Sequence, residues 1–355
     1  MSTLEGLRRQ IDTAEDLESV VTTMKSLAAV SIRQYERAVE ALRDYNRVIE
    51  MGFHIVLRTG AAQIENVPAG RTGAVVFGSD QGMCGKFNEE IAGFVHDTFE
   101  EEKAAGVAAP GQPGRGSSST ASGRRDANAP ARRAGDLDRT PTPQSGRPGG
   151  PSSTNQTQAV LHPWKLIAVG TRAEGALLDA GFSLDHTYVV PTSISDVTNL
   201  TQELLPRIEH GREHAGLTRL LVFYNLRTGA ASYRPQCLQL LPIAADRLRR
   251  WRDQPWQSRS LPLFVSDRRE LLARLVREYL FVSLYRACAE SLASENASRI
   301  AAMQAAQQNI EERLDDLQIS FHHLRQTAIT EALLDVVTGF EALSQERQKA
   351  PDRLH

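Results

Sequence analysis

The segment from Asp267 to Thr338 contains neither glycine nor proline, and this feature constrains the fold more than any other. In a helix interior these two residues cost ~1 and ~3 kcal/mol relative to alanine. Asp267 and Glu270 have the spacing of a capping box, and Gly339 is expected to end the helix. One helix of this length would reach about 100 Å, several times the radius of a compact domain. The sequence therefore predicts a long projecting helix, although two or three shorter helices with a hidden bend would also fit.

The apolar residues of this segment recur at steps of three and four, which places them along one narrow stripe of a helix. The stripe consists of Ile300, Met303, Ile310, Leu314, Leu317, Phe321, Leu324 and Ala328. Charged residues such as Glu311 and Asp315 lie between these positions and suit a solvated face. Because a narrow stripe is covered by a partner helix, we expect a second long helix to pack along this one.

A second long helical pattern runs from Leu4 to Met51 and repeats every seven residues. One set of positions comprises Leu7, Ala14, Val21, Ala28, Tyr35, Leu42 and Ile49; a second set, three residues further on, includes Leu17, Met24, Ala38 and Tyr45. This a/d pattern is typical of a coiled coil. We expect the N- and C-terminal helices to form a long antiparallel coiled coil, although pairing between two chains would also fit.

Between the two helical patterns, short apolar runs alternate with shorter helices. Strands are expected at 73–78, 165–170, 219–225 and 237–243, with a weaker one at 187–190; helices are expected at 88–96, 172–180 and 196–210, the first and last capped by Asn88 and Asp196, and 247–262 is expected to be a connector. Pro206 should weaken the second half of the last helix. Such alternation indicates a mainly parallel sheet with helices on its faces, a Rossmann-like α/β domain.

Residues 104–158 interrupt this α/β pattern. They are rich in Gly, Pro, Ser, Ala and Arg, and such a composition cannot bury enough apolar surface to offset the entropy of ordering the chain. The expected organisation is an N-terminal helix (1–60), a first α/β half (69–103), a disordered insertion (104–158), a second α/β half (159–262), a C-terminal helix (263–345) and a tail (346–355).

The sequence contains no motif of a self-sufficient enzyme. The turn from Gly78 to Gly85 follows a strand, but its glycine spacing is wrong for a P-loop, and Phe87 stands where the magnesium-binding hydroxyl would be. We expect no catalytic residue, no metal site and no cofactor. A net charge of -2 argues against nucleic acid as a partner. The absence of a long apolar run and of a signal peptide favours a cytosolic or peripheral protein.

Several motifs carry a resemblance to a known family. The strongest are Ala293-Ser-Glu295, Ala297, Arg299, Ala302-Met303, Ala305 and Asn309, followed by Leu324-Arg325-Gln326, Ala328-Ile329-Thr330 and Glu331; Met24-Lys25, Gly78-Ser-Asp80, Cys84-Gly85, Tyr224-Asn225 and Gln239-Leu-Leu-Pro242 add to them. Taken in their order along the chain, these motifs resemble those of the gamma subunit of F-type ATP synthases.

The resemblance implies a non-catalytic central-stalk rotor that couples ion flow through a membrane c ring to ATP synthesis or hydrolysis. Its shaft would lie inside the hexamer of alpha and beta subunits, and its α/β foot would rest on the c ring beside the epsilon subunit, at the cytoplasmic face of the membrane. Beta-subunit contacts are expected at Lys25, Arg325, Gln326 and Thr330. The residues expected to turn in an apolar bearing are Leu333, Leu334, Val336, Val337 and Phe340.

Two other functions also fit the residues. One is a structural tether, in which the coiled coil joins proteins and the α/β domain is not catalytic. The other is a degenerate nucleotide-binding protein built on the glycine turn.

Overall fold

The computed structural model describes residues 3–58, 70–104, 165–229, 232–256, 264–265 and 267–349. The predicted insertion lies outside these residues, except for Ala104. In chain order the elements are α1 (Leu4–Arg58), β1 (Arg71–Phe77), α2 (Phe87–Ala104), β2 (Lys165–Val169), α3 (Thr171–Asp179), β3 (Leu184–Tyr188), α4 (Ile194–His214), β4 (Leu217–Arg227), β5 (Tyr233–Leu241), α5 (Ala245–Asp253) and α6 (Arg268–Lys349). Within the described residues, none of the helices is both long and apolar enough to cross a membrane.

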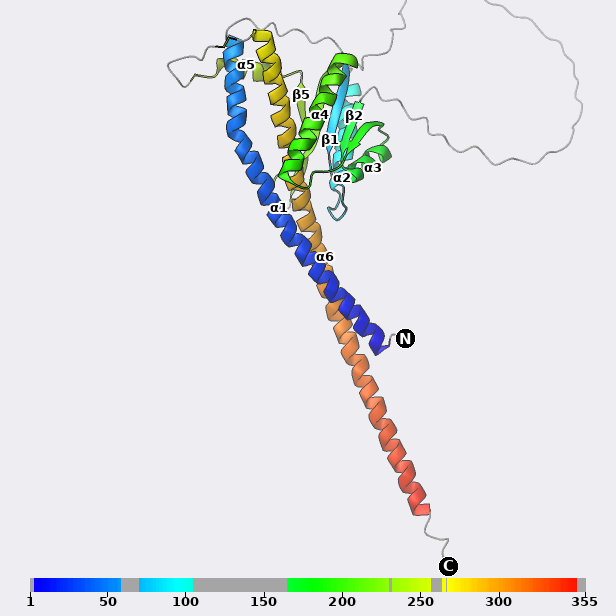
Figure 1. Cartoon of the computed structure of the whole chain (residues 1–355). Helices are drawn as coiled ribbons and strands as arrows, with labels where there is room; N and C mark the ends of the chain where they lie inside the picture. Colours follow the sequence, from blue (N-terminus) through cyan, green and yellow to red (C-terminus); the bar gives the residue numbers. More distant parts are fainter. Residues whose placement is uncertain are drawn as a thin grey trace, which may run out of the picture. The chain divides into compact units, whose positions relative to one another are not determined.

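Helices α1 and α6 run antiparallel along each other (Figure 1). Near one end Tyr45 Oη donates to Glu278 Oε2 at 2.7 Å, and further along Lys25 Nζ donates to Gln307 Oε1 at 2.7 Å. The predicted antiparallel pairing of the two chain ends is confirmed within a single chain.

The first set of heptad positions in α1 faces α6 as predicted, with Leu7, Ala28, Tyr35 and Ile49 all buried. The second set is wrong at two places, because Leu17 is 52 % and Tyr45 is 44 % exposed. The buried residues between the members of the first set lie four positions on, as Ile32 and Phe53 do. For any helical residue, the residue three positions later lies on one side of it and the residue four positions later lies on the other side. Helix α6 and the α/β domain cover the side of α1 that carries the residues four positions later.

Helix α6 spans 82 residues without interruption. Asp267 caps it, because its carboxylate accepts from the backbone N–H groups of Arg269 and Glu270. The predicted end at Gly339 is wrong. A Cβ at this glycine would meet nothing within 4 Å, and a single glycine costs a helix only ~1 kcal/mol, so the helix continues to Lys349.

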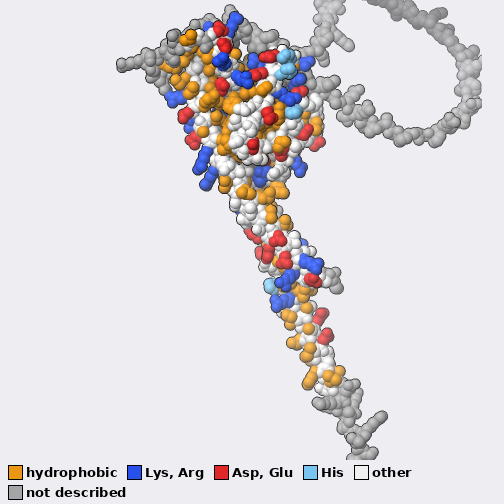
Figure 2. Space-filling model, in the orientation of Figure 1, with side chains coloured by type: hydrophobic (Ala, Val, Ile, Leu, Met, Phe, Trp, Pro, Cys, Tyr) orange, Lys and Arg blue, Asp and Glu red, His pale blue; other side chains and the backbone are white. Residues whose placement is uncertain are grey.

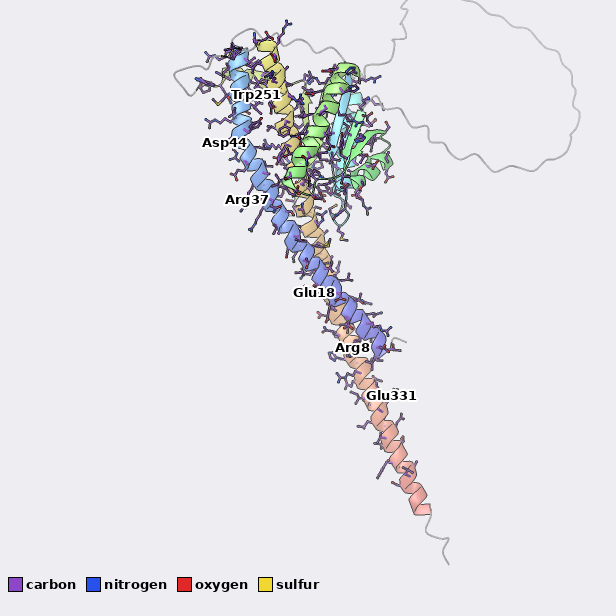
Figure 3. All side chains as sticks on the ribbon, viewed as in Figure 1. Arg8, Glu18, Arg37, Asp44, Trp251 and Glu331 are labelled. Carbon is purple, nitrogen blue, oxygen red and sulfur yellow. The ribbon has the colours of Figure 1, made fainter. Side chains whose placement is uncertain are left out.

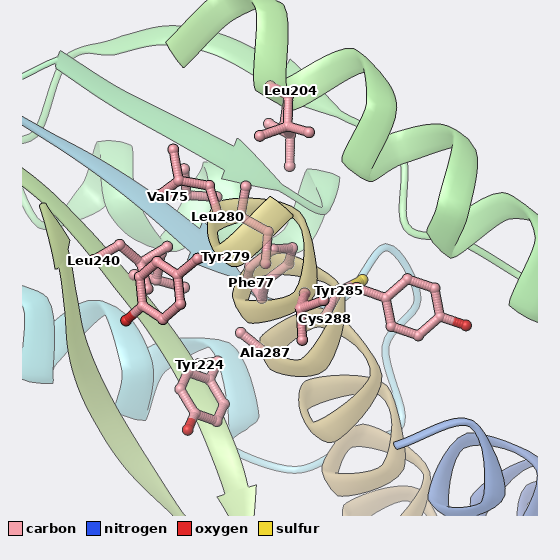
Figure 4. Packing of buried hydrophobic residues seen from close by; sticks show 14 of the residues in the cluster. Val75, Phe77, Leu204, Tyr224, Leu240, Tyr279, Leu280, Tyr285, Ala287 and Cys288 are labelled. Atoms are coloured by element: carbon pink, nitrogen blue, oxygen red, sulfur yellow. The ribbon is translucent and has the colours of Figure 1, made fainter. Parts of the chain in front are cut away.

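The five strands form one sheet in the order β3-β2-β1-β4-β5, parallel except for the β4–β5 pair. Alternate residues of β1 point to opposite faces, as the two-residue period of a strand requires. Ala74 and Val76 belong to a core that includes residues of α2 and α3. Val75 and Phe77 belong to the larger core that includes residues of α1, α4 and α6 (Figure 4). Helix α6 is therefore both part of the domain core and half of the coiled coil.

Three local predictions need correction. Asn88 is not the cap of α2, because the helix starts at Phe87 and the Asn88 carboxamide accepts from the Ser79 N–H at 2.9 Å. Ser193 caps α4, and Asp196 is its partner in a capping box, while Pro206 lies inside a helix that continues to His214. The predicted connector contains α5, whose one buried residue is Trp251. With only nine residues, α5 is shorter than the stretch over which a helical pattern can be told from a connector.

Candidate functional site

Helix α6 extends well beyond the start of α1, and this extension is the candidate functional site. Leu324 is half-buried near Leu7 of α1, whereas every side chain from Arg325 to Ser344 is exposed. We call residues 325–344 the free segment. Figure 3 shows the position of the free segment: Glu331 lies on the part of α6 that extends beyond Arg8, near the start of α1. Ala328, predicted to lie in the buried stripe, is exposed because α1 does not reach it.

The free segment carries an unusual amount of exposed apolar surface (Figure 2). All five predicted bearing residues lie on it: Leu333 is 62 %, Leu334 55 %, Val336 72 %, Val337 44 % and Phe340 73 % exposed. Together with Ile329 and Leu343, the residues Leu333, Val336 and Phe340 follow steps of four and three, so they form one helix face. An exposed apolar face of this kind indicates a binding surface.

The predicted polar contact residues Arg325, Gln326 and Thr330 occupy the start of the free segment, and all three are exposed. Thr330 Oγ1 donates to the carbonyl of Gln326 at 2.9 Å, as threonine commonly does within a helix. The hydroxyl proton of Thr330 is therefore engaged in a hydrogen bond within α6, while the hydroxyl oxygen is still able to accept a hydrogen bond from a partner. Polar groups thus precede the apolar face along the helix.

Lys25 is placed apart from these residues. Its ammonium group donates to Gln307 Oε1 at 2.7 Å, and Gln307 Nε2 in turn donates to Glu311 Oε1 at 2.9 Å. Lys25 is half-buried, so this hydrogen bond links α1 to α6. The structure therefore brings together the predicted residues of α6 but not Lys25.

A second feature, which the sequence analysis missed, joins α6 to the sheet. Three serines on one face of the helix donate to backbone carbonyls of the α/β domain. Ser291 Oγ reaches the Phe77 carbonyl at 3.3 Å, Ser294 Oγ the Asn225 carbonyl at 2.8 Å, and Ser298 Oγ the Cys84 carbonyl at 2.6 Å. We call this group the serine row. It fixes α6 against the ends of β1 and β4 and against the glycine turn.

An ion pair lies beside the serine row. Arg299 Nη2 donates to Glu295 Oε1 at 2.6 Å, with only 13 % and 7 % of the two side chains exposed. Burial raises the pKa of the Glu295 carboxyl more than Arg299 lowers it, and the nearby Asp80 carboxylate raises it further. The protein therefore keeps a costly buried charge where α6 meets the α/β domain.

The glycine turn is closed by groups of the chain itself. The Asp80 carboxylate accepts from the backbone N–H groups of Thr171 and Val190, both at 2.7 Å. Thr171 begins α3, and helix N-termini of this kind bind phosphate in nucleotide-binding folds. Because the carboxylate of Asp80 already occupies this position, the geometry argues against nucleotide binding at the turn.

Comparison with known proteins identifies the relatives of the chain. The family model described as "ATP synthase" matches residues 3–142 and 151–343. The ATP synthase gamma chain of Blochmanniella pennsylvanica is 33 % identical over 123 residues, which cover 35 % of this chain and 41 % of that protein. The gamma chain of Nitrosococcus oceani is 28 % identical over 184 residues, covering 51 % and 62 %. The chain thus matches less than two thirds of the length of either relative.

The fold is also that of a solved protein. A chain in the OSCP/F1/c-ring structure of the Euglena gracilis mitochondrial ATP synthase, in rotational state 3, aligns with a TM-score of 0.53. The alignment covers 99 % of this chain and 98 % of that chain at 14 % identity. At this identity the likeness concerns the fold alone.

Proposed function

This chain belongs to the ATP synthase family, and from this membership we propose that it is the central-stalk rotor, or gamma subunit, of an F-type ATP synthase. It would transmit rotation between a membrane c ring and the catalytic hexamer of alpha and beta subunits, without a catalytic site of its own. The names of its curated relatives support this assignment.

The free segment is the observation that carries the proposal. A rotor shaft must present surface to partners that surround it, and the chain leaves every side chain from Arg325 to Ser344 exposed. The apolar face around Phe340 suits a bearing, because it offers no directional bond that would have to break at each step. The preceding polar residues Arg325, Gln326 and Thr330 suit contacts with beta subunits that form and break during rotation.

Continuity of α6 explains how rotation would reach this surface. The same helix packs in the core through Leu280, is fixed to the sheet by the serine row, and pairs with α1 before it continues as the free segment. Torque applied to the α/β domain would therefore pass into the shaft through hydrogen bonds and packing, with no flexible joint in between.

The remaining assignments complete the proposal. The α/β domain would form the foot that contacts the c ring and the epsilon subunit, and the complex would place the chain at the cytoplasmic face of the membrane as a peripheral subunit. Lys25 would contact a beta subunit only if it exchanged its bond to Gln307 for a partner carboxylate, so its role would be transient.

The test replaces both Gln326 and Thr330 with leucine in the assembled complex. Both positions are exposed, so the free energy of unfolding of the chain should change by less than about 0.5 kcal/mol. Loss of polar contacts worth about 1 kcal/mol at the limiting step would lower coupled ATP turnover about fivefold.

The matched control changes Thr22 and Ser26 to leucine, an exposed, uncharged pair with the same spacing on α1, in which Ser26 Oγ donates to the Thr22 carbonyl as Thr330 Oγ1 does to that of Gln326. It should leave coupled turnover unchanged. Equal turnover in the Gln326/Thr330 variant, the control and the unaltered complex would remove the contact role. A complex that assembles without the chain and still couples ion flow to ATP synthesis would refute the rotor assignment itself.

A further inference from the structure

A cavity away from the free segment is lined by four arginines. It lies between α1, α5, β5 and α6, and its volume of about 470 Å³ is in the usual range for small-molecule sites. Arg43 comes from α1, Arg247 and Arg250 from α5, and Arg286 from α6. Four guanidinium groups from three helices therefore converge on one cavity, which we call the arginine pocket.

The pocket has an excess of positive charge. Glu50 is the one carboxylate among its lining residues, and it already accepts from Asn46 Nδ2 at 2.9 Å. Outside the lining, Glu290 pairs with Arg286 at 2.8 Å. The chain as a whole has a net charge of -2, so this concentration of cations is local.

Three of the four arginines have no acidic partner within the described residues. Arg247 donates to the Tyr279 hydroxyl, and its guanidinium carbon lies 5.8 Å from the centre of the Tyr279 ring. Within the described residues, Arg43 and Arg250 form no salt bridge. Arg250 alone could be explained by its place in the last turn of α5, where a cation complements the helix dipole. That explanation does not apply to the arginines of α1 and α6.

The wall of the pocket is rigid and aromatic. The Trp251 ring stacks on Phe53 with centroids 4.5 Å apart and meets the Tyr279 ring edge-on at 5.4 Å. Trp251 is only 4 % exposed. Asn46, Gln254 and Ser283 add neutral polar groups to the lining. A fixed wall of this kind lowers the entropy cost of binding a ligand.

We propose that the arginine pocket binds a multivalent phosphate anion. Guanidinium groups form paired hydrogen bonds to phosphate oxygens, and a ligand with at least two phosphate groups could meet several arginines at once. Such a ligand also removes the mutual repulsion of the four cations. The chemistry is shared by free compounds such as pyrophosphate and by the headgroup of a phospholipid that carries two phosphate groups. This proposal does not depend on the rotor assignment.

The experiment titrates the full-length chain with pyrophosphate at physiological ionic strength, followed by calorimetry and by tryptophan fluorescence. A parallel arm measures binding to phosphatidylcholine vesicles that contain phosphatidylinositol 4-phosphate, whose headgroup carries two phosphate groups. The variants are Arg43→Gln and Arg250→Gln, because both side chains are exposed and neither forms a salt bridge in the described chain. The control is Arg249→Gln, on the same helix as Arg250 but outside the lining, where it pairs with Asp246 at 3.9 Å.

Each pocket variant should weaken binding about tenfold, as loss of one charge-assisted hydrogen bond predicts, and the control should bind like the unaltered chain. Pyrophosphate should also raise the melting temperature of the unaltered chain but not that of a chain that carries both Arg43→Gln and Arg250→Gln. Binding to the vesicles alone, lost in both variants, would identify a lipid headgroup as the ligand. Failure to bind either probe, or equal weakening by Arg249→Gln, would overturn the proposal.

Discussion

Replacing Ser294 by alanine tests whether the serine row holds α6 against the sheet. Ser294 is fully buried, and its hydroxyl donates to the Asn225 carbonyl at 2.8 Å. Across the β4–β5 ladder, Asn225 faces Pro235, which has no N–H to donate. Because proline cannot take part in a hydrogen-bonded pair of an antiparallel ladder, the Asn225 carbonyl points away from β5, and the Ser294 hydroxyl provides a donor for it.

The expected magnitude follows from two opposing effects. Leaving a buried carbonyl without a donor costs about 1–3 kcal/mol. Alanine is the better helix former by about 0.5 kcal/mol, which offsets a small part of that cost. Ser294→Ala should therefore lower the free energy of unfolding by about 0.5–2.5 kcal/mol.

Ser320→Ala is a matched control on the same helix. Each hydroxyl lies 2.8 Å from the carbonyl four residues earlier, that of Glu290 for Ser294 and that of Asp316 for Ser320. The single hydroxyl proton of Ser294 is shared between the Glu290 and Asn225 carbonyls, whereas that of Ser320 has the local carbonyl only. Ser320 is exposed and has no contact with the sheet, so its replacement should be neutral or slightly stabilising. Urea unfolding followed by tryptophan fluorescence measures both, because the buried Trp251 reports on the larger core. If the two variants agree within about 0.5 kcal/mol, the bond from Ser294 to the sheet contributes nothing and the reasoning is refuted.

Two further predictions concern the core and the buried ion pair. Phe53→Ala should lower the free energy of unfolding, measured with urea, by about 3–5 kcal/mol, because Phe53 is completely buried between Trp251 and Tyr279. The control Val48→Ala, at a position 64 % exposed, should change it by no more than about 0.5 kcal/mol. Similar values for the two variants would contradict the packing of Phe53. For Glu295 the raised pKa in the folded state means that its contribution to stability is complete below the ordinary pKa of 4.5 and is lost as the pH rises through the raised value. Glu295→Gln should therefore gain stability relative to the unaltered chain as the pH increases above 4.5; a difference that stays constant with pH, measured by chemical unfolding, would show that the pKa is not raised.

Much of the fold could be predicted because long helices repeat their signal many times. The apolar stripe from Met303 to Leu324 and the first heptad set of α1 could both be predicted, since each further turn of the helix adds another apolar residue at the same spacing. The second set was misplaced because Leu17 and Ile32 flank the first set on opposite sides, and only the position of α6 and the α/β domain decides which side is covered. Asn88 is a good cap by residue type, yet a distant backbone N–H, that of Ser79, competes for its side chain.

The parts of the candidate site that depend only on which residues are exposed could be predicted from the sequence. The parts that depend on hydrogen-bond partners far away in the chain could not. The free segment follows from the different lengths of the two helical patterns. The serine row does not, because its acceptors come from β1, β4 and the glycine turn. Its signal in the sequence is three serines at helical spacing, Ser291, Ser294 and Ser298, but Glu290, Glu295 and Asn296 lie among them and obscure it. The arginine pocket gave no signal, since its arginines come from three helices that are far apart in the chain.

The free segment also has a consequence for how a rotor of this kind could work. A single helix without tertiary contacts is only marginally stable in water, and nothing in the described chain packs against residues 325–344. Burial of side chains such as Leu333 and Phe340 contributes about 1.5–3 kcal/mol each. A surrounding partner that covers the apolar face would therefore stiffen the helix by the same contacts that hold it in place. In that case stiffness at the tip of α6 belongs to the assembled complex, whereas stiffness nearer the sheet belongs to the chain itself, through α1 and the serine row.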